Sequence, residues 1–334
     1  MSLPNESHGR VVDLVAIGGG TGLSTLLSGL REYVDDPGRE LSVGRLSAVV
    51  AVSDDGGSSG RLRDEFQIPP PGDIRNCMVA LSEDSHLLSQ LFKYRFSGEG
   101  DLAGHNFGNL FLAALTDVTG DFAEAVRLSS EILASKGHIY PATVSDVRIA
   151  ARLTDGTIVQ GETNISKTGG TIERLYLEPD DCDPHPDVIA AIAQADVITV
   201  GPGSLFTSIL PPLLVRGVVD AIVGSHARTV FICNLMTQPG ETDGLTARRH
   251  LEIVRDYAPS LNFDHIVVNS TPIRAEQLEL YTRDGAEQIG VHGSIESDVI
   301  EGASVIRGEL LADGPLVRHD PVRLAKCVLD LAGR

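Results

Sequence analysis

The sequence predicts an α/β protein built on a doubly wound, mostly parallel sheet. Short continuous apolar runs, such as residues 46–52, are typical of strands that are buried on both faces of a parallel sheet. Each run is followed by a glycine-rich or polar loop and then by apolar residues at helical spacing. This strand–loop–helix order recurs at least four times, as a doubly wound sheet requires.

The first part of the chain supplies two of these strands and several helices. Residues 11–17 are a β-branched run, and the apolar residues that follow share one face of a helix: Leu23, Leu26, Leu27, Leu30 and Val34. Residues 46–52 are the second strand, and the proline-stiffened residues 69–76 are expected to be a rigid loop. Later helices are expected over residues 77–92 and 121–135, the latter with Asp121 as its N-cap. Residues 103–118 are expected to be a loop that opens another helix.

The middle of the chain, about residues 140–180, is expected to be a small β-rich insertion. Its apolar and polar residues alternate, and Asp155-Gly156 marks a hairpin turn. No linker-like composition separates it from its neighbours, so we place it within one domain. The parallel-sheet pattern then returns with a helix over residues 186–196 and with strands at "VITV", "TVFI" and "HIVVN".

Composition limits the class of protein. The 334 residues are 42% hydrophobic, enough for a substantial core, and their net charge of −19 excludes a broad electrostatic contact with nucleic acid. A small anionic ligand is still compatible, because backbone N–H groups can bind phosphate. The four cysteines show no C-x-x-C spacing, so neither a zinc site nor a disulfide framework is expected.

The same features predict the location of the protein. No apolar run has the length of about 18–20 residues that a membrane span needs. Residues 1–10 are polar, without the apolar core of a leader, and are expected to be disordered. We therefore expect a cytoplasmic protein without a membrane span and with one folded domain over residues 11–332.

Two glycine-rich turns between a strand and a helix predict an anion-binding site. The first is "GGGTG" (Gly18, Gly19, Gly20, Thr21, Gly22), and the second contains Gly201, Gly203 and Ser204. Backbone N–H groups at a helix N-terminus attract phosphate. Leu23 breaks the dinucleotide fingerprint G-x-G-x-x-G, and no lysine completes a P-loop. The alternative is that these glycines only form tight turns.

A second candidate is "SDDGGSSGRLR", which follows the strand over residues 46–52. Asp54 and Asp55 are adjacent on an extended chain and point to opposite sides, so one could hold Mg²⁺ while the other anchors the loop. The glycines, hydroxyls and guanidinium that follow could contact phosphate: Gly56, Gly57, Ser58, Ser59 and Arg61. The alternative is a solvated Asx turn.

Further polar residues follow other predicted strands or open helices. Asp73, Arg75 and Asn76 belong to the stiff loop, and His105 and Asn109 lie where a helix begins. Asn234 and Gln238 follow the strand "TVFI", and amides suit recognition of a base or a sugar. Because carboxyl ends of parallel strands share one edge of the sheet, these residues are expected to gather in one crevice.

Six motifs occur in order and resemble those of a known family: "IGGGTGLSTLLSGL", "SDDGGSSGRLR", "PPGDIRNC", "GHNFGN", "GPGSLFTSILP" and "CNLMTQPGET". They look like the gluconeogenesis factor (YvcK-type) branch of the CofD-like, or 2-phospho-L-lactate transferase, superfamily. The resemblance implies a single CofD-like domain with a Rossmann-like three-layer α/β/α fold. The transferase branch moves a phospholactyl group from a guanosine diphosphate donor to a deazaflavin with Mg²⁺. The other branch is associated with UDP-sugar binding, cell shape and growth on gluconeogenic carbon.

Carried over by motif, the resemblance implies phosphate contacts at Thr21 and its neighbouring glycines, and a metal at Asp54 or Asp55. It also implies that Asn234 lies near the nucleotide or sugar and that Arg61 and residues 73–76 close the same cleft. The expected function is nucleotide-sugar binding, with a Mg²⁺-dependent transferase as the alternative. No tightly bound flavin or NAD is expected, catalytic residues are not assigned, and a homodimer is the default oligomeric state.

Overall fold

A computed structural model of the chain describes residues 10–36, 38–83, 86–283, 285–290 and 298–333. The predicted disordered terminus therefore lies outside the described residues, apart from Arg10. That residue already belongs to the first strand, β1 (Arg10–Gly18), and its backbone N–H donates to the carbonyl of Glu40.

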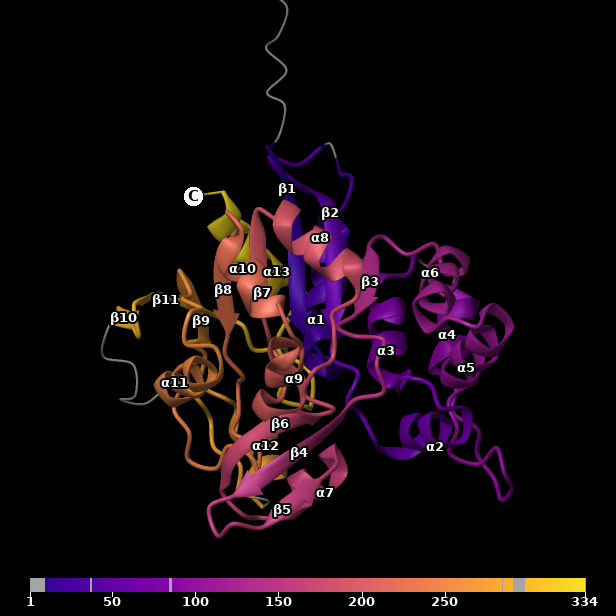
Figure 1. Cartoon of the computed structure of the whole chain (residues 1–334). Helices are drawn as coiled ribbons and strands as arrows, with labels where there is room; N and C mark the ends of the chain where they lie inside the picture. The colour runs from indigo at the N-terminus through magenta and orange to yellow at the C-terminus, as the bar shows by residue number, and fades with distance from the viewer. Residues whose placement is uncertain (1–9, 37, 84–85, 284, 291–297, 334) are drawn as a thin grey trace, which may run out of the picture.

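Eight strands of the described chain form one sheet, in the order β10-β11-β9-β8-β7-β1-β2-β3 (Figure 1). Every neighbouring pair is parallel except β10 and β11. The strands after β1 are β2 (Leu41–Val50), β3 (His138–Pro141), β7 (Val197–Val200), β8 (Arg228–Ile232), β9 (His265–Asn269), β10 (Val299–Ile300) and β11 (Ala303–Gly308). The chain order reverses between β1 and β7, so ligand binding is expected where these two strands end.

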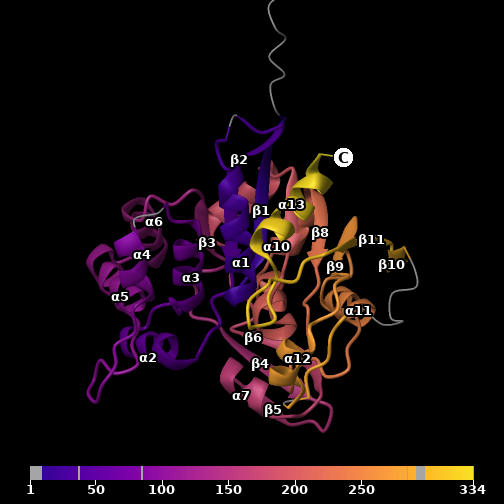
Figure 2. The same cartoon turned by 180° about the vertical axis from the view of Figure 1, so that it is seen from behind.

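Helices cover both faces of the sheet, which confirms the predicted three-layer α/β/α architecture (Figures 1 and 2). One face carries α1 (Gly20–Leu30), α3 (Gly72–Leu81) and α13 (Pro321–Ala332). The other carries α8 (Pro186–Gln194), α9 (Leu210–Leu214) and α10 (Val218–Gly224), with a π-helical turn η2 (Leu205–Ile209) leading into α9.

The remaining helices lie around these layers. A lobe beside β3 contains α2 (Gly57–Phe66), α4 (His86–Lys93), α5 (Phe107–Thr119) and α6 (Phe122–Ile132) (Figure 1). Asp121 caps α6 as predicted, because its carboxylate accepts the N–H of Glu124 at 2.7 Å. The later part of the chain adds α11 (Ala247–Tyr257) and α12 (Ala275–Thr282), and a 3₁₀ turn, η1 (Arg31–Tyr33), follows α1.

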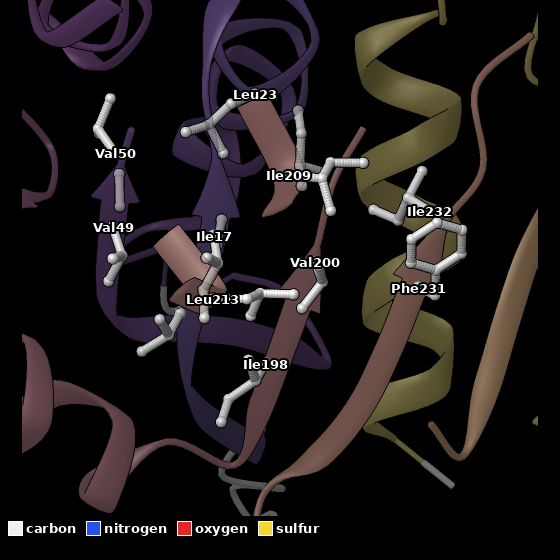
Figure 3. Close-up of a cluster of buried hydrophobic side chains, with 14 of the residues drawn as sticks. Ile17, Leu23, Val49, Val50, Ile198, Val200, Ile209, Leu213, Phe231 and Ile232 are labelled. Carbon is white, nitrogen blue, oxygen red and sulfur yellow. The ribbon is translucent and has the colours of Figure 1, made fainter. Parts of the chain in front are cut away.

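The core lies where the central strands meet the helices above them. In Figure 3, Ile17 of β1 and Val200 of β7 lie close to Leu213 of α9, and all three are buried. Every residue of β7 is buried, as expected for a strand that is covered on both faces. Leu23, Leu26, Leu27 and Leu30 form the buried face of α1, which confirms the predicted helical spacing.

The β-rich insertion is a separate antiparallel sheet of β4 (Arg148–Leu153), β5 (Ile158–Gln160) and β6 (Ile172–Glu178), with β4 in the centre. The Asp155-Gly156 turn joins β4 and β5 as predicted. The sequence did not predict α7 (Glu162–Lys167), which interrupts the insertion. The insertion lies at the end of the molecule where the parallel strands terminate (Figure 1).

Three predicted boundaries are wrong. Residues 73–76 are not loop but the first turns of α3, because Pro71 forms the N-cap and the helix needs no donor from it. The helix predicted over 77–92 is two helices, since Ser82 turns to an extended conformation after α3. Val34 lies outside α1 and pairs with Val43 in an isolated bridge.

Within the described residues, no single helix is long and apolar enough to cross a membrane. Two consecutive helical segments, residues 205–214 and 218–224, meet the length and composition criteria only together, and the chain bends by 76° between them.

We expect Gly29→Ala to lower the free energy of unfolding by about 1–3 kcal/mol. A β-carbon at Gly29 would lie 1.9 Å from the carbonyl oxygen of Pro321, so α13 would have to move away from α1. Urea denaturation measures the loss. Gly224→Ala is the matched control, because no atom lies within 4 Å of a β-carbon there. Equal stability of the two variants would contradict the close packing of α1 and α13.

Candidate functional site

The two predicted glycine turns meet where β1 and β7 end. A β-carbon at Gly22 would lie 2.4 Å from the carbonyl oxygen of Pro202, so only glycine allows the two backbones to approach so closely. Gly18 and Gly201 end their strands behind this contact, and a β-carbon at Gly201 would lie 2.7 Å from the carbonyl oxygen of Ile232. Glycine is therefore needed at positions 22 and 201, because the backbones there pack too closely for a side chain.

A cavity of about 780 Å³ opens beside these turns, within the usual size of a small-molecule site. It is lined by eight of the residues that the sequence predicted: Gly19, Gly20, Thr21, Gly22, Gly203, Ser204, Asn234 and Gln238. The N-terminus of α1 faces this cavity and has no side-chain cap. The carboxylate of Asp73 accepts the N–H of Gly20, and the next N–H groups of this first turn have no partner within the helix, so they can bind an anion.

Two buried acceptors at the cavity make no hydrogen bond within the described chain. They are Oε1 of Gln238 and Nε2 of His319. Burial lowers the pKa of His319 to about 4, so its ring is neutral at pH 7, and its hydrogen bond with the backbone of Cys233 acts in the opposite direction. Unpaired buried acceptors are costly, so the pair favours a ligand that carries N–H or O–H donors.

Two of the predicted ligand contacts, Asn234 and Ser204, also make hydrogen bonds that hold the site together. The side chain of Asn234 accepts the N–H of Gly203 at 3.1 Å and donates to the Gly203 carbonyl at 2.6 Å. The hydroxyl of Ser204 donates to Glu241, which also accepts from Ser166 of α7 at 2.6 Å. Asn234 and Ser204 therefore position the second glycine turn.

Acidic groups surround the cavity. Burial and the charges of Asp54, Asp73 and Glu241 raise the pKa of Glu162 to about 8. Burial and the charge of Asp54 raise the pKa of Asp73 to about 6, against the effect of its hydrogen bond with the N–H of Gly20. Glu162 is therefore largely protonated at pH 7 and can donate a hydrogen bond.

Asp54 and Asp55 make different contacts, as their opposite orientations predict. Asp55 accepts the N–H and the hydroxyl of Thr163, at 2.9 and 2.7 Å, and so ties α7 to the end of β2. Asp54 accepts the N–H of Gly56 at 2.8 Å, which is an Asx turn. Its other oxygen faces the start of α3, 2.8 Å from a β-carbon placed at Gly72.

Asp54, Asp55 and Asp73 do not form a complete metal site by themselves, so a metal ion would also need oxygen ligands from a bound phosphate. Within the described chain, no group of three or more His, Cys, Asp or Glu side chains is arranged to hold a metal ion. The contacts of Asp55 with Thr163 occupy one of its oxygens and orient the carboxylate toward α7. Asp54 and Asp73 interact electrostatically, and two carboxylates are the number that usually hold Mg²⁺ beside substrate phosphates.

The other predicted residues gather beside the cavity without lining it. Gly57, Ser58, Ser59 and Arg61 lie in α2 and not in a loop. Asp73, Arg75 and Asn76 lie in α3, where Asn76 hydrogen bonds with Asp73. His105 and Asn109 lie at the start of α5 and contact Ser58. These residues do not line the cavity, and their grouping with it in one crevice stays a prediction.

Sequence reasoning missed several residues that line the cavity: Glu162, Ser166, Thr207, Ser208, Tyr281, Arg318 and His319. Glu162 and Ser166 come from the unpredicted helix α7, and the last three come from segments without a motif. Only Ser208 had a usable signal, because it lies one helical turn after Ser204.

The chain is similar to known proteins over most of its length. A model of the family described as 2-phospho-L-lactate transferase CofD matches residues 14–311. A Bacillus subtilis protein named gluconeogenesis factor is 42% identical over 324 residues, which are 97% of this chain and 99% of the relative. A Halalkalibacterium halodurans protein of the same name is 42% identical over 318 residues, with coverage of 95% and 96%. The crystal structure of a UPF0052 family member from Bacillus halodurans superimposes with a TM-score of 0.89 at 43% identity, covering 96% of this chain and 99% of that one.

We expect Asp55→Ala to loosen α7 because Thr163 loses both acceptor contacts. The expected cost is about 1–2 kcal/mol of unfolding free energy, as for loss of a helix cap, with faster amide hydrogen exchange in residues 163–167. Asp36→Ala removes a carboxylate that accepts a backbone N–H in an exposed, remote loop and serves as control. Unchanged exchange in α7 would show that Asp55 does not hold it.

We expect Glu162→Gln to flatten the pH dependence of stability. The pKa of Glu162 is about 8 in the folded protein against an ordinary value of 4.5, so the folded state keeps a proton that the unfolded chain releases between these values. Glu162 therefore makes wild-type stability fall as pH rises from about 4.5 to 8. The amide removes this contribution and leaves the smaller fall due to Asp73, whose pKa is raised to about 6.

Urea denaturation at pH 5 and pH 8.5 measures this difference. The exposed Glu279→Gln in α12 is the control and should keep the wild-type profile. If Glu162→Gln shows the wild-type decline, Glu162 is not the group that titrates.

Proposed function

The chain belongs to the CofD family, and on that premise we propose that it is a nucleotide-sugar-binding protein of the gluconeogenesis-factor type. The diphosphate binds at the N-terminus of α1, and the sugar and base occupy the rest of the cavity. We propose a UDP-sugar as the ligand and carbon metabolism, together with cell shape, as the processes it serves.

The observation that carries this proposal is the pairing of two features in one cavity: a helix N-terminus whose N-cap residue, Gly19, supplies no side chain, and two unpaired buried acceptors. The first suits the diphosphate, and the backbones of Gly19 to Gly22 leave room for it. Oε1 of Gln238 and Nε2 of His319 suit the donors of a nucleotide-sugar, namely the sugar hydroxyls and the base N–H. An inorganic diphosphate would leave both acceptors unpaired.

A second candidate is a Mg²⁺-dependent transferase of the 2-phospho-L-lactate type, favoured by the paired carboxylates of Asp54 and Asp73. These two residues would hold the ion, which neutralises diphosphate charge and favours departure of the nucleoside monophosphate. The chain's own contribution is positioning: the α1 N-terminus orients the diphosphate, and Glu162 donates a hydrogen bond beside it. Such chemistry needs few reactive side chains.

We expect UDP-GlcNAc or UDP-glucose to raise the melting temperature more than GDP does, with or without Mg²⁺, and to remain intact. Gln238→Leu should weaken UDP-sugar binding about 5–15-fold, because one ligand donor loses its acceptor. The same substitution should leave the ligand-free protein as stable or more stable, since a buried unpaired oxygen is removed.

Calorimetric titration and urea denaturation measure the two effects, with the exposed Gln194→Leu in α8 as control. Stabilisation by GDP and a deazaflavin alone, with turnover in Mg²⁺, would favour the transferase instead. Equal UDP-sugar affinity of wild type and Gln238→Leu would remove Gln238 from the site.

A further inference from the structure

Three arginines outside the cavity come together in the helical lobe. Arg61 lies on α2, Arg75 lies on α3, and Arg95 follows α4. Arg61 Nη2 donates to the carbonyl of Ala103 at 2.9 Å, and Arg95 Nη1 donates to the next carbonyl, that of Gly104, at 2.7 Å. The two guanidinium groups therefore hold consecutive peptide groups of one loop.

Arg75 lies close enough to Arg95 for their charges to interact. Burial and, next in size, the charge of Arg95 lower the pKa of Arg75. Its Nε donates to Oδ1 of Asn109 at 3.1 Å, which directs the side chain over the start of α5. Burial, with the charges of Arg61 and Arg95, likewise lowers the pKa of His105. The charges of Arg61 and Arg95 therefore both act on His105, and the carboxylate of Glu65 acts in the opposite direction.

No carboxylate is in direct contact with these positive charges, although Asp73 and Asp54 act on Arg75 from a distance and Glu65 acts on His105. Among the described residues, none of the three arginines makes an ion pair within 4.0 Å, although the chain carries a net charge of −19. Each guanidinium makes one hydrogen bond within that part of the chain, which leaves N–H groups for another acceptor. Unpaired like charges repel one another, and an anion between them would remove that cost.

A rigid polar network supports the cluster. Ser58 Oγ accepts the N–H of Asn106 and an amide N–H of Asn109, both at 3.2 Å, so its own proton points to His105 Nδ1 at 3.2 Å. The proton of a neutral His105 then lies on Nε2, where it can serve as a further donor. The N-terminus of α2, at Gly57, lies beside this network and has no side-chain cap.

We propose that Arg61, Arg75 and Arg95, together with His105, bind the phosphate or carboxylate group of a second ligand. This site is separate from the cavity, because none of the four residues lines it. Asp73 connects the two regions: it bonds with the N–H of Gly20 at the cavity, and Arg75 lies two residues later on the same helix. The inference goes beyond the nucleotide-sugar proposal and does not require it.

Binding of inorganic phosphate and of malonate, measured by calorimetry at low ionic strength, tests the proposal. We expect one or both to bind wild type at a saturable site and to bind R61Q/R95Q about tenfold more weakly or worse. Both arginines are exposed, so the variant should keep its fold, which its thermal melting verifies. R61K/R95K keeps the positive charges but lacks the planar guanidinium groups, so its anion affinity should lie between those of wild type and R61Q/R95Q. A preference for phosphate or for malonate identifies the ligand's anionic group.

Two controls separate this site from other effects. R45Q removes an exposed arginine that hydrogen bonds only with Gln194 in the described chain, and Gln238→Leu alters the cavity alone. Both should bind the anion as wild type does. The proposal is overturned if wild type binds neither anion, if R61Q/R95Q binds normally, or if R45Q loses as much affinity. Because no nucleotide is added, failure of UDP-sugar binding would leave this result unaffected.

Discussion

The backbone contact between the two glycine turns is the constraint on which the site depends. Gly22 lies against the carbonyl of Pro202, and Gly19 is enclosed by Ala51, Asp73 and Ser208. This packing fixes where α1 begins, so the N-terminus of α1 faces the cavity and not the core. The same contact brings Asp73 to the N–H of Gly20. Asp54, whose charge acts on Asp73, lies nearby. A side chain at Gly22 would push the two glycine turns apart.

The proposed ligand is an anion, but acidic side chains surround the site and would repel it. Protonation of a carboxyl group reduces this repulsion. Arg318 is the only permanently charged cation among the described residues that line the cavity. The pKa of Glu162 is raised to about 8, so this carboxyl group is largely neutral at physiological pH, whereas Asp73, with a pKa raised to about 6, is still mostly ionised. The anionic ligand that we propose would then be held mainly by backbone N–H groups and neutral donors. We therefore expect its affinity to depend on pH more than on ionic strength.

Much of the fold could be predicted from the sequence, because buried parallel strands and the leucine face of α1 are local patterns. The glycine turns could also be placed, since strand ends share one edge of the sheet. The placement of the other polar motifs in helices could not be predicted, because it depends on where α2 and α3 begin. Gly57 and Gly72 open these helices within segments that contain the usual signals for loops. Glu162 and His319 carry no sequence signal, as their roles arise from tertiary burial alone.

The pairing of β1 with β7 also determines when the site can form. The N–H of Asp13 bonds with Asp196 across 183 residues of chain, and the two strands are neighbours at the centre of the sheet. Closing so long a segment costs chain entropy before any contact is gained, so we expect this pairing to form late in folding. The cavity, which needs both strand ends, is absent from every partly folded state that lacks this pairing. A ligand bound there consequently recognises the completed fold and slows its unfolding as a unit.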